Sequence, residues 1–194
     1  GRWLVGSTAH QLVRTSACPV LIAGPANTGL PRRVLAAVDL SIAATPTLVA
    51  AARFAAMLEA DFGMLHVVEP VAPAFDPVLG PTKASLGIME EDARFEAVED
   101  VLDKSVWPKL LYPGAERLVR RGPPSATIVA EALAWHADVL VVGTHGRGFV
   151  ERLVLGSVTN HLLNDLPMSL LVVPMVRPAH VFEPAPLPLS MALA

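Results

Sequence analysis

Apolar and polar residues follow two different periods along most of the chain. Short, nearly continuous apolar runs indicate buried strands at residues 20–23, 33–39, 63–68, 115–120, 138–142 and 169–173. Between these runs, apolar residues recur every three or four positions, which predicts helices at residues 7–14, 44–60, 88–107, 125–135 and 157–165. Strands that alternate with helices predict an α/β fold, an open parallel sheet with right-handed crossovers.

Two of the predicted helices begin near a serine suited to capping, Ser125 and Ser157. The helix at residues 88–107 carries seven acidic side chains, six of which we interpret as a solvated face: Glu90, Glu91, Asp92, Glu96, Glu99 and Asp100. The proline-rich connection at residues 69–85 is longer than most loops, and we expect it to be mobile and to lie near the mouth of a crevice.

An internal repeat relates the two ends of the chain. Residues 1–24 align with residues 151–174 without a gap, so that Arg2, Gly6, Ser7, Leu12 and Leu21 recur as Arg152, Gly156, Ser157, Leu162 and Leu171. We therefore expect the last helix and strand of one domain at 1–24, a linker at 25–31, a complete second copy at 32–176 and a proline-rich tail at 177–194.

Residues 20–23 need a partner strand, because an apolar edge left open invites aggregation. Residues 170–173 form the other apolar edge, and the linker is long enough for the two runs to pair antiparallel. The fragment keeps only half of the glycine pattern described below, so we expect it to hold no second binding site of that kind.

Composition narrows the class of protein. The chain has 194 residues, of which 53% are hydrophobic and 17% charged, with a net charge of −3. These values exclude a disordered chain and argue against a nucleic-acid binder. No apolar run reaches the roughly 18–20 residues of a membrane helix, so we expect a soluble protein and a cytoplasmic location. The one cysteine, Cys18, excludes a disulfide within the chain, and its apolar surroundings predict a buried side chain.

The chemistry-bearing stretch follows the strand at 138–142. Gly143, Gly146, Gly156 and Ser157 frame a loop that ends at a helix start, where free N–H groups and the helix dipole suit a phosphate. The pattern is neither a Walker A loop nor the dinucleotide G-x-G-x-x-G. Arg147, within the loop, is a candidate phosphate contact, with a solvated side chain as the equal alternative.

Asp39 ends the strand at 33–39, and this strand and the glycine-loop strand are candidates to flank the ligand crevice of a parallel sheet. A carboxylate beside phosphates would be repelled, so Asp39 belongs at the base or ribose end of a nucleotide. Its alternative role is a cap for the following helix.

These residues resemble the universal stress protein family of the ATP-binding type. The resemblance covers about residues 31–175 and rests on Gly143, Gly146, Gly156 and Ser157, with Asp39, residues 137–141 and His66-Val67 in support. It implies an adenine nucleotide α-hydrolase-like, five-stranded parallel sheet of order 3-2-1-4-5. It also implies a homodimer or a tandem pairing through the last strand.

The resemblance also implies the ligand and its contacts. The ligand would be ATP, or AMP or ADP, with or without Mg²⁺. The adenosine side would be lined by Ala37, Val38, Asp39 and the backbone of Val67. Ribose and phosphates would be held by Val142, Gly143, Gly146, Gly156, Ser157 and Val158.

Other reactive residues favour structural roles. His66 lies inside a predicted strand and is read as a core histidine, and the histidines lack metal-ligand spacing. No G-x-S-x-G elbow makes Ser41 a nucleophile. The resemblance implies a nucleotide-binding module of the stress response whose occupancy regulates conformation or partners. The alternatives are an enzyme that is at most a weak ATPase, and a dimerisation module that binds no nucleotide.

Overall fold

The computed structural model describes residues 6–24, 29–39, 41, 44–70, 93, 95–106, 112–144, 155–165 and 168–175. Its elements in chain order are α1 (Ser7–Thr15), β1 (Val20–Ile22), β2 (Arg33–Val38), α2 (Ala44–Met57), β3 (Asp61–Val68), η2 (Leu102–Val106), β4 (Glu116–Arg121), α4 (Pro124–Ala134), β5 (Val139–Gly143), α5 (Ser157–Asn164) and β6 (Ser169–Val173). The predicted α/β class is confirmed, with most element ends shifted by one to three residues from the sequence-based bounds.

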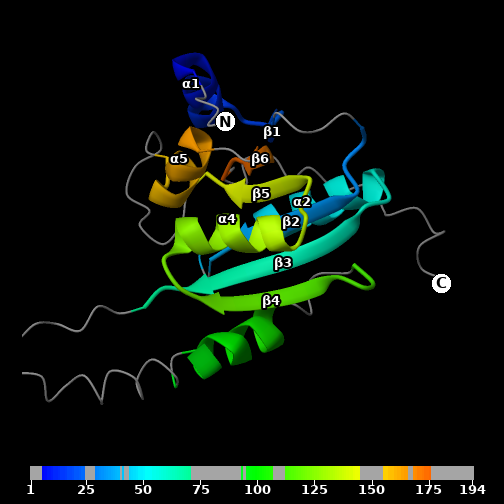
Figure 1. The fold of residues 1–194 in the computed structure, drawn as a ribbon, viewed down its shortest axis with the longest axis vertical. Coiled ribbons are helices and arrows are strands. Elements are labelled where there is room, and N and C mark those ends of the chain that lie inside the picture. The colour runs from blue at the N-terminus through cyan, green and yellow to red at the C-terminus, as the bar shows by residue number, and fades with distance from the viewer. Residues whose placement is uncertain are drawn as a thin grey trace, which may run out of the picture.

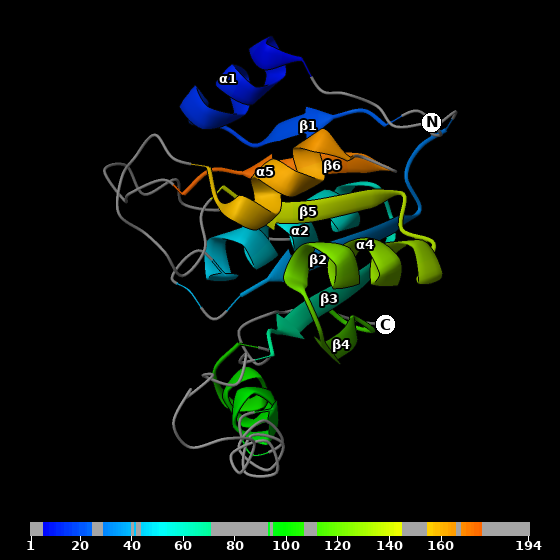
Figure 2. The ribbon, with the colours of Figure 1, turned by 60° about the vertical axis from the view of Figure 1, so that its left-hand side comes forward.

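The strands form one sheet in the order β1-β6-β5-β2-β3-β4 (Figure 1). The pairs β6–β5, β5–β2, β2–β3 and β3–β4 are all parallel. These five strands follow the order expected for the domain, and β1 adds a sixth strand at the β6 edge (Figure 2). The predicted antiparallel pairing is confirmed: Val20 lies opposite Val172, Leu21 opposite Leu171 and Ile22 opposite Leu170.

Helices cover both faces of the sheet because its strands alternate their side chains. In β2, Val34, Ala36 and Val38 face a core that includes Leu48 of α2 and Leu102 of η2. Leu35 and Ala37 face the opposite core, which holds buried residues of α4, α5 and α1. Figures 1 and 2 show α4 and α5 on one side of the sheet and α2 on the other. Continuous apolar strands are typical of a sheet buried on both faces.

Two helices end by the same device, although neither has a glycine at the end. Glu59 and His136 have φ angles of 52° and 53°, in the left-handed region. Beyond them, the N–H of Ala60 bonds to the carbonyl of Ala55 at 3.0 Å, and that of Ala137 to the carbonyl of Ala132 at 2.8 Å. This is a Schellman ending. It stops α2 at Met57, where the pattern predicted a helix to residue 60.

The structure overturns several local expectations. Ser125 lies inside the first turn of α4, whose N-cap is Pro123, because a proline at the first helical position lets the helix begin earlier. Cys18 is exposed rather than buried, because it lies in the bend before β1 and outside any strand. The predicted helix at 88–107 is described only in part, and its end, Leu102–Val106, is a π-helix.

Among the residues that the structure describes, none belongs to a helix long and apolar enough to cross a membrane.

Candidate functional site

The carboxyl ends of β2 and β5 separate at the centre of the sheet. The ladder between these strands runs from Val34–Val139 to Ala36–Val141. Each strand continues for two residues beyond it, to Val38 and to Gly143. The helix that follows β2 packs on one face of the sheet, and the helix that follows β5 packs on the other. Ligands of open α/β sheets bind at such a switch point, outside the carboxyl ends of the strands.

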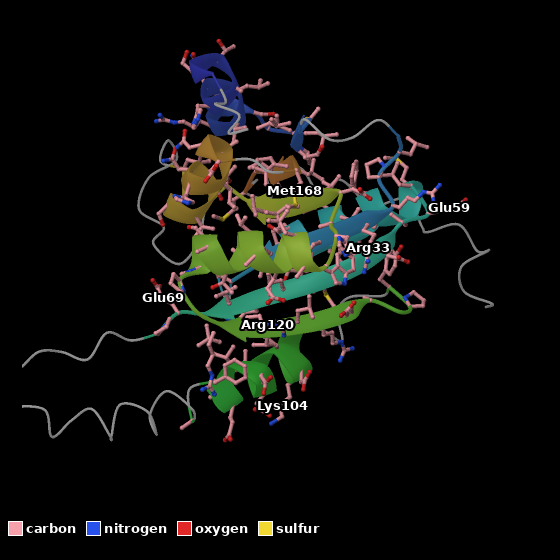
Figure 3. The ribbon with its side chains drawn as sticks, in the orientation of Figure 1. Arg33, Glu59, Glu69, Lys104, Arg120 and Met168 are labelled. Carbon is pink, nitrogen blue, oxygen red and sulfur yellow. The ribbon has the colours of Figure 1, made fainter. Side chains whose placement is uncertain are left out.

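Asp138 links β2 and β5 at the amino ends of these strands, which is the opposite end of the sheet from the switch point. Its Oδ2 atom accepts hydrogen bonds from the backbone N–H groups of Arg32 and Arg33, at 2.8 and 3.0 Å. The Arg33 guanidinium also stacks on Trp135, 4.3 Å from the ring centroid. Figure 3 shows Arg33 at the end of the sheet opposite Glu69, which directly follows β3. The contacts of Asp138 and Arg33 therefore align β2 with β5 at the amino ends of the strands. They lie apart from the carboxyl ends, where the candidate site is.

Asp39 follows β2 directly and is half-buried. Its Oδ1 atom accepts a hydrogen bond of 3.0 Å from the backbone N–H of Ser41. This bond closes an Asx turn that leads the chain toward α2. The turn is similar to the alternative role considered for Asp39, which was to cap the helix that follows. A carboxylate accepts about four hydrogen bonds, so the turn leaves capacity for a ligand.

His66 joins the ends of β2 and β3. Its Nδ1 atom lies 2.7 Å from the carbonyl oxygen of Val38. Because a carbonyl only accepts, Nδ1 carries the proton in this bond. The side chain is 2% exposed. The prediction of a core histidine is confirmed, and His66 stiffens the backbone that ends at Asp39.

The start of α5 is held against the end of β5 by two threonines. The Thr159 hydroxyl donates to the carbonyl of Gly143 at 2.7 Å, and the Gly156 N–H donates to the carbonyl of Thr144 at 2.8 Å. Thr144 in turn donates its N–H to the carbonyl of Val173 at 2.9 Å. These bonds place the first turn of α5 at the carboxyl edge.

The first turn of α5 offers its backbone donors to that edge. Gly156 is the N-cap, with φ −56° and ψ 146°, and no side chain caps the helix. The expectation that Ser157 caps α5 is therefore wrong, because Ser157 is already the first helical residue. Its exposed hydroxyl lies beside N–H groups that have no partner within a helix. Such a terminus favours anions.

The other predicted site residues fall into two groups, those with buried and those with half-buried side chains or backbone. Ala37, Val38 and Val142 are buried, so only their backbone can face a ligand, whereas Val67, Gly143 and Val158 are half-buried. Gly146 and Arg147 lie outside the described residues, as does most of the 69–85 loop. Sequence reasoning missed Thr144 and Thr159, although a threonine within an apolar helix face, as at 159, is a usable signal of a back-bonding hydroxyl. The described residues include no group of three or more His, Cys, Asp or Glu side chains that could hold a metal ion.

Comparisons with known proteins identify the fold and the family. The model of the universal stress protein family matches residues 31–174. Universal stress protein A homolog 2 from Coxiella burnetii is 26% identical over 128 residues, which are 66% of this chain and 84% of that protein.

Two solved structures share the fold. Universal stress protein UspA from Lactobacillus plantarum superposes with a TM-score of 0.63 at 23% identity, over 76% of this chain and 99% of that one. A functionally unknown protein from Pseudomonas aeruginosa PAO1 has a TM-score of 0.63 at 20% identity, over 88% of this chain but 57% of that one. The family model matches residues 31–174 of this chain, a range that includes β2 to β6. This chain therefore belongs to the universal stress protein family.

Proposed function

We propose that this chain is an adenine-nucleotide-binding module of the stress response, in which ATP occupancy regulates conformation or partners. The observation that carries the proposal is the meeting of three features at one edge of the sheet. Asp39 follows β2, Gly143 ends β5, and Gly156–Ser157 begin α5. The glycine spacing that joins the last two is the motif of the ATP-binding members of the family.

Charge gives the nucleotide its direction. The phosphates bind at the first turn of α5, where backbone N–H groups, the Ser157 hydroxyl and the helix dipole favour negative charge. The adenosine extends toward β2 and β3, away from those phosphates. There Asp39 accepts hydrogen bonds from ribose hydroxyls, and the half-buried Val67 offers its backbone to the base.

Glycine serves this proposal because it allows backbone N–H groups to approach phosphates without an intervening Cβ. Gly143 is the last residue of β5, Gly146 comes three residues later in the sequence, and Gly156 directly precedes α5. Any Mg²⁺ that accompanies the nucleotide would be held by the phosphates together with water.

Isothermal titration calorimetry with ATP, ADP and AMP tests the proposal. The unmodified chain should release heat with at least one nucleotide, and the others should compete for the same site. Gly146→Val should abolish binding by placing a branched side chain where the phosphates approach. Gly29→Val is the matched control, because a Cβ at Gly29 meets nothing within 4 Å. Absence of heat and of competition with the unmodified chain would overturn the proposal.

A further inference from the structure

His66 and Val38 mark the place where β2 loses its neighbours in the sheet. The ladder between β2 and β5 ends at Ala36–Val141, whereas the ladder between β2 and β3 continues to Val38–His66. Beyond this point β3 continues with β4 as its paired strand. Among the described strands, the last peptide of β2, between Val38 and Asp39, is therefore supported on the β3 side alone.

The imidazole of His66 supports this peptide from a buried position. Its Nδ1–H donates to the Val38 carbonyl at 2.7 Å, and the side chain is 2% exposed. Met64 and Val68 of β3 belong to the core that also contains Leu48 of α2, so the alternation of side chains places His66 on that face as well. Because water cannot easily reach this face, His66 remains a donor that orients the carbonyl.

Peptide geometry carries the effect of this bond from Val38 to Asp39. A trans peptide is planar, so its C=O and N–H point in opposite directions, and the described part of the chain contains no cis peptide bond. Because the Val38 carbonyl points toward His66 on β3, the Asp39 N–H points away from β3 and toward β5. The ladder with β5 has already ended there, so this N–H faces the switch point between the two strands.

Asp39 is therefore held at two places. The bond from His66 orients the peptide that precedes Asp39, and the 3.0 Å bond from the Ser41 N–H holds its Oδ1 atom. Without the first of these bonds, the turn with Ser41 still holds the carboxylate, but the preceding peptide can rotate more freely. The first turn of α5 is held by other bonds, those of Thr144 and Thr159. The two halves of the candidate site are thus positioned by separate side chains.

We propose that His66 is a positioning residue for the adenosine half of the site: through its Nδ1–H it fixes the peptide between Val38 and Asp39, and so sets how Asp39 meets the ligand. The effect on the ligand rests on the proposed function, whereas the effect on the backbone does not. His66 itself contacts no ligand. Its loss weakens the contacts of Asp39 with adenosine and leaves the phosphate contacts at α5 unchanged.

Amide hydrogen exchange without nucleotide tests the effect on the backbone. His66→Asn keeps an N–H as many bonds from Cβ as Nδ1, whereas His66→Gln moves it one bond farther and His66→Leu removes it. Exchange at the Ser41 amide should be roughly tenfold faster in the Gln and Leu variants and close to the unmodified rate in the Asn variant. The Arg33 amide is the matched control, because it donates to the Asp138 carboxylate at the other end of β2, and its exchange should not change.

Calorimetric titration with ATP and AMP tests the effect on the ligand. Affinity should fall about three- to tenfold in His66→Gln and His66→Leu, and by less than about twofold in His66→Asn. The loss should be smaller in an Asp39→Ala background, because His66 acts through Asp39, and undiminished in a Thr159→Val background, which alters the α5 side. Met64→Leu, on the same strand and in the same core, is the packing control and should bind as the unmodified chain does.

Two results would overturn this role for His66. One is a folded Gln or Leu variant whose Ser41 amide exchanges as slowly as in the unmodified chain. The other is a His66→Asn protein that loses as much affinity as His66→Gln, because the imidazole would then serve packing alone. If the unmodified chain binds no nucleotide, the proposed function is wrong, and the exchange rate at Ser41 still decides whether His66 positions Asp39.

Discussion

The hydroxyl of Thr159 donates a hydrogen bond of 2.7 Å to the carbonyl oxygen of Gly143. This bond joins the first turn of α5 to the last residue of β5, across a connection that contains the glycine motif. Thr159 is 4% exposed, so water cannot easily replace it. The distance between the two glycines that frame the proposed phosphate site therefore depends on a side chain that would not itself contact the ligand.

Replacement of Thr159 by valine, which keeps the shape and removes the hydroxyl, should lower the free energy of unfolding by about 1–3 kcal/mol, because a shielded carbonyl loses its partner. We also expect weaker nucleotide binding. Thr15→Val is the control, since Thr15 makes the same kind of bond to Gln11 at 2.9 Å on an exposed helix. Urea unfolding measures both variants, and equal losses of stability would contradict the assigned role.

Asp39→Ala should weaken ATP or AMP binding about 10- to 100-fold, since a hydrogen bond to a charged group contributes roughly 1.5–3 kcal/mol. Asp61→Ala is the control, because Asp61 is exposed at the amino end of β3, the opposite edge of the sheet. Calorimetric titration gives both affinities. An Asp39→Ala protein that binds as tightly as the unmodified chain would show that Asp39 serves only the turn with Ser41.

Deletion of residues 1–24 should shift the protein toward homodimers or aggregates. Removal of β1 uncovers the β6 edge, whose residues Leu170, Leu171 and Val172 are then free to pair with another chain. Light scattering coupled to size-exclusion chromatography measures the change. With Leu171→Cys, the deleted protein should also form an oxidised dimer, while the whole chain with the same substitution in a Cys18→Ser background should not; the second substitution is needed because Cys18 is exposed. An unchanged oligomeric state and solubility would mean that β1 does not protect this edge.

Glu59→Gly and His136→Gly should each raise the free energy of unfolding, by about 0.5–1 kcal/mol. Both residues hold a left-handed conformation that costs about 1–2 kcal/mol for a residue with a Cβ, offset in part by the greater chain entropy of glycine. Ala56→Gly, inside α2, should lower stability by a similar amount. Denaturant unfolding of the three variants gives the comparison, and destabilisation by all three would contradict the Schellman assignment.

Burial raises the pKa of Tyr112 above its ordinary value, and the nearby Asp61 carboxylate raises it further. The folded state then keeps the phenol proton at pH values where the unfolded chain has lost it. The free energy of unfolding should therefore fall as the pH rises above about 10 and continue to fall up to the folded pKa. Tyr112→Phe should remove this part of the pH dependence, at the expense of the 2.7 Å hydrogen bond to the carbonyl of Ala60.

Tyr112 is the single tyrosine of the chain, so ultraviolet titration of tyrosinate measures its pKa directly. Asp61→Asn should lower that pKa toward the ordinary value without reaching it, because burial is the larger cause. A pKa unchanged from that of the unfolded chain would contradict the environment described for Tyr112.

Local pattern predicted the elements well and their ends less well. The apolar runs located the strands, because burial on both faces of a parallel sheet leaves a signature within five or six consecutive residues. Helix ends were predicted wrongly where the usual residue at the end was missing, or where the residue present fits more than one position of the helix. Glu59 and His136 take a place that glycine usually marks. Ser125 is as compatible with a first turn as with a cap, and only the start of α4 at Pro124 distinguishes the two.

The sequence by itself determined the order of strands and helices, the glycine spacing and the repeat. Each of these depends only on neighbouring residues or on the number of residues between two positions. The tertiary structure decided what each of these residues touches. The segment Gly-Ser-x4-Leu occurs twice, yet Leu162 is 1% exposed and Leu12 is 53% exposed. The difference comes from α4 and β5, which precede α5 in the chain and pack in one core with Leu162 but not with Leu12. Burial is supplied by such partners, so two identical local patterns can have opposite environments.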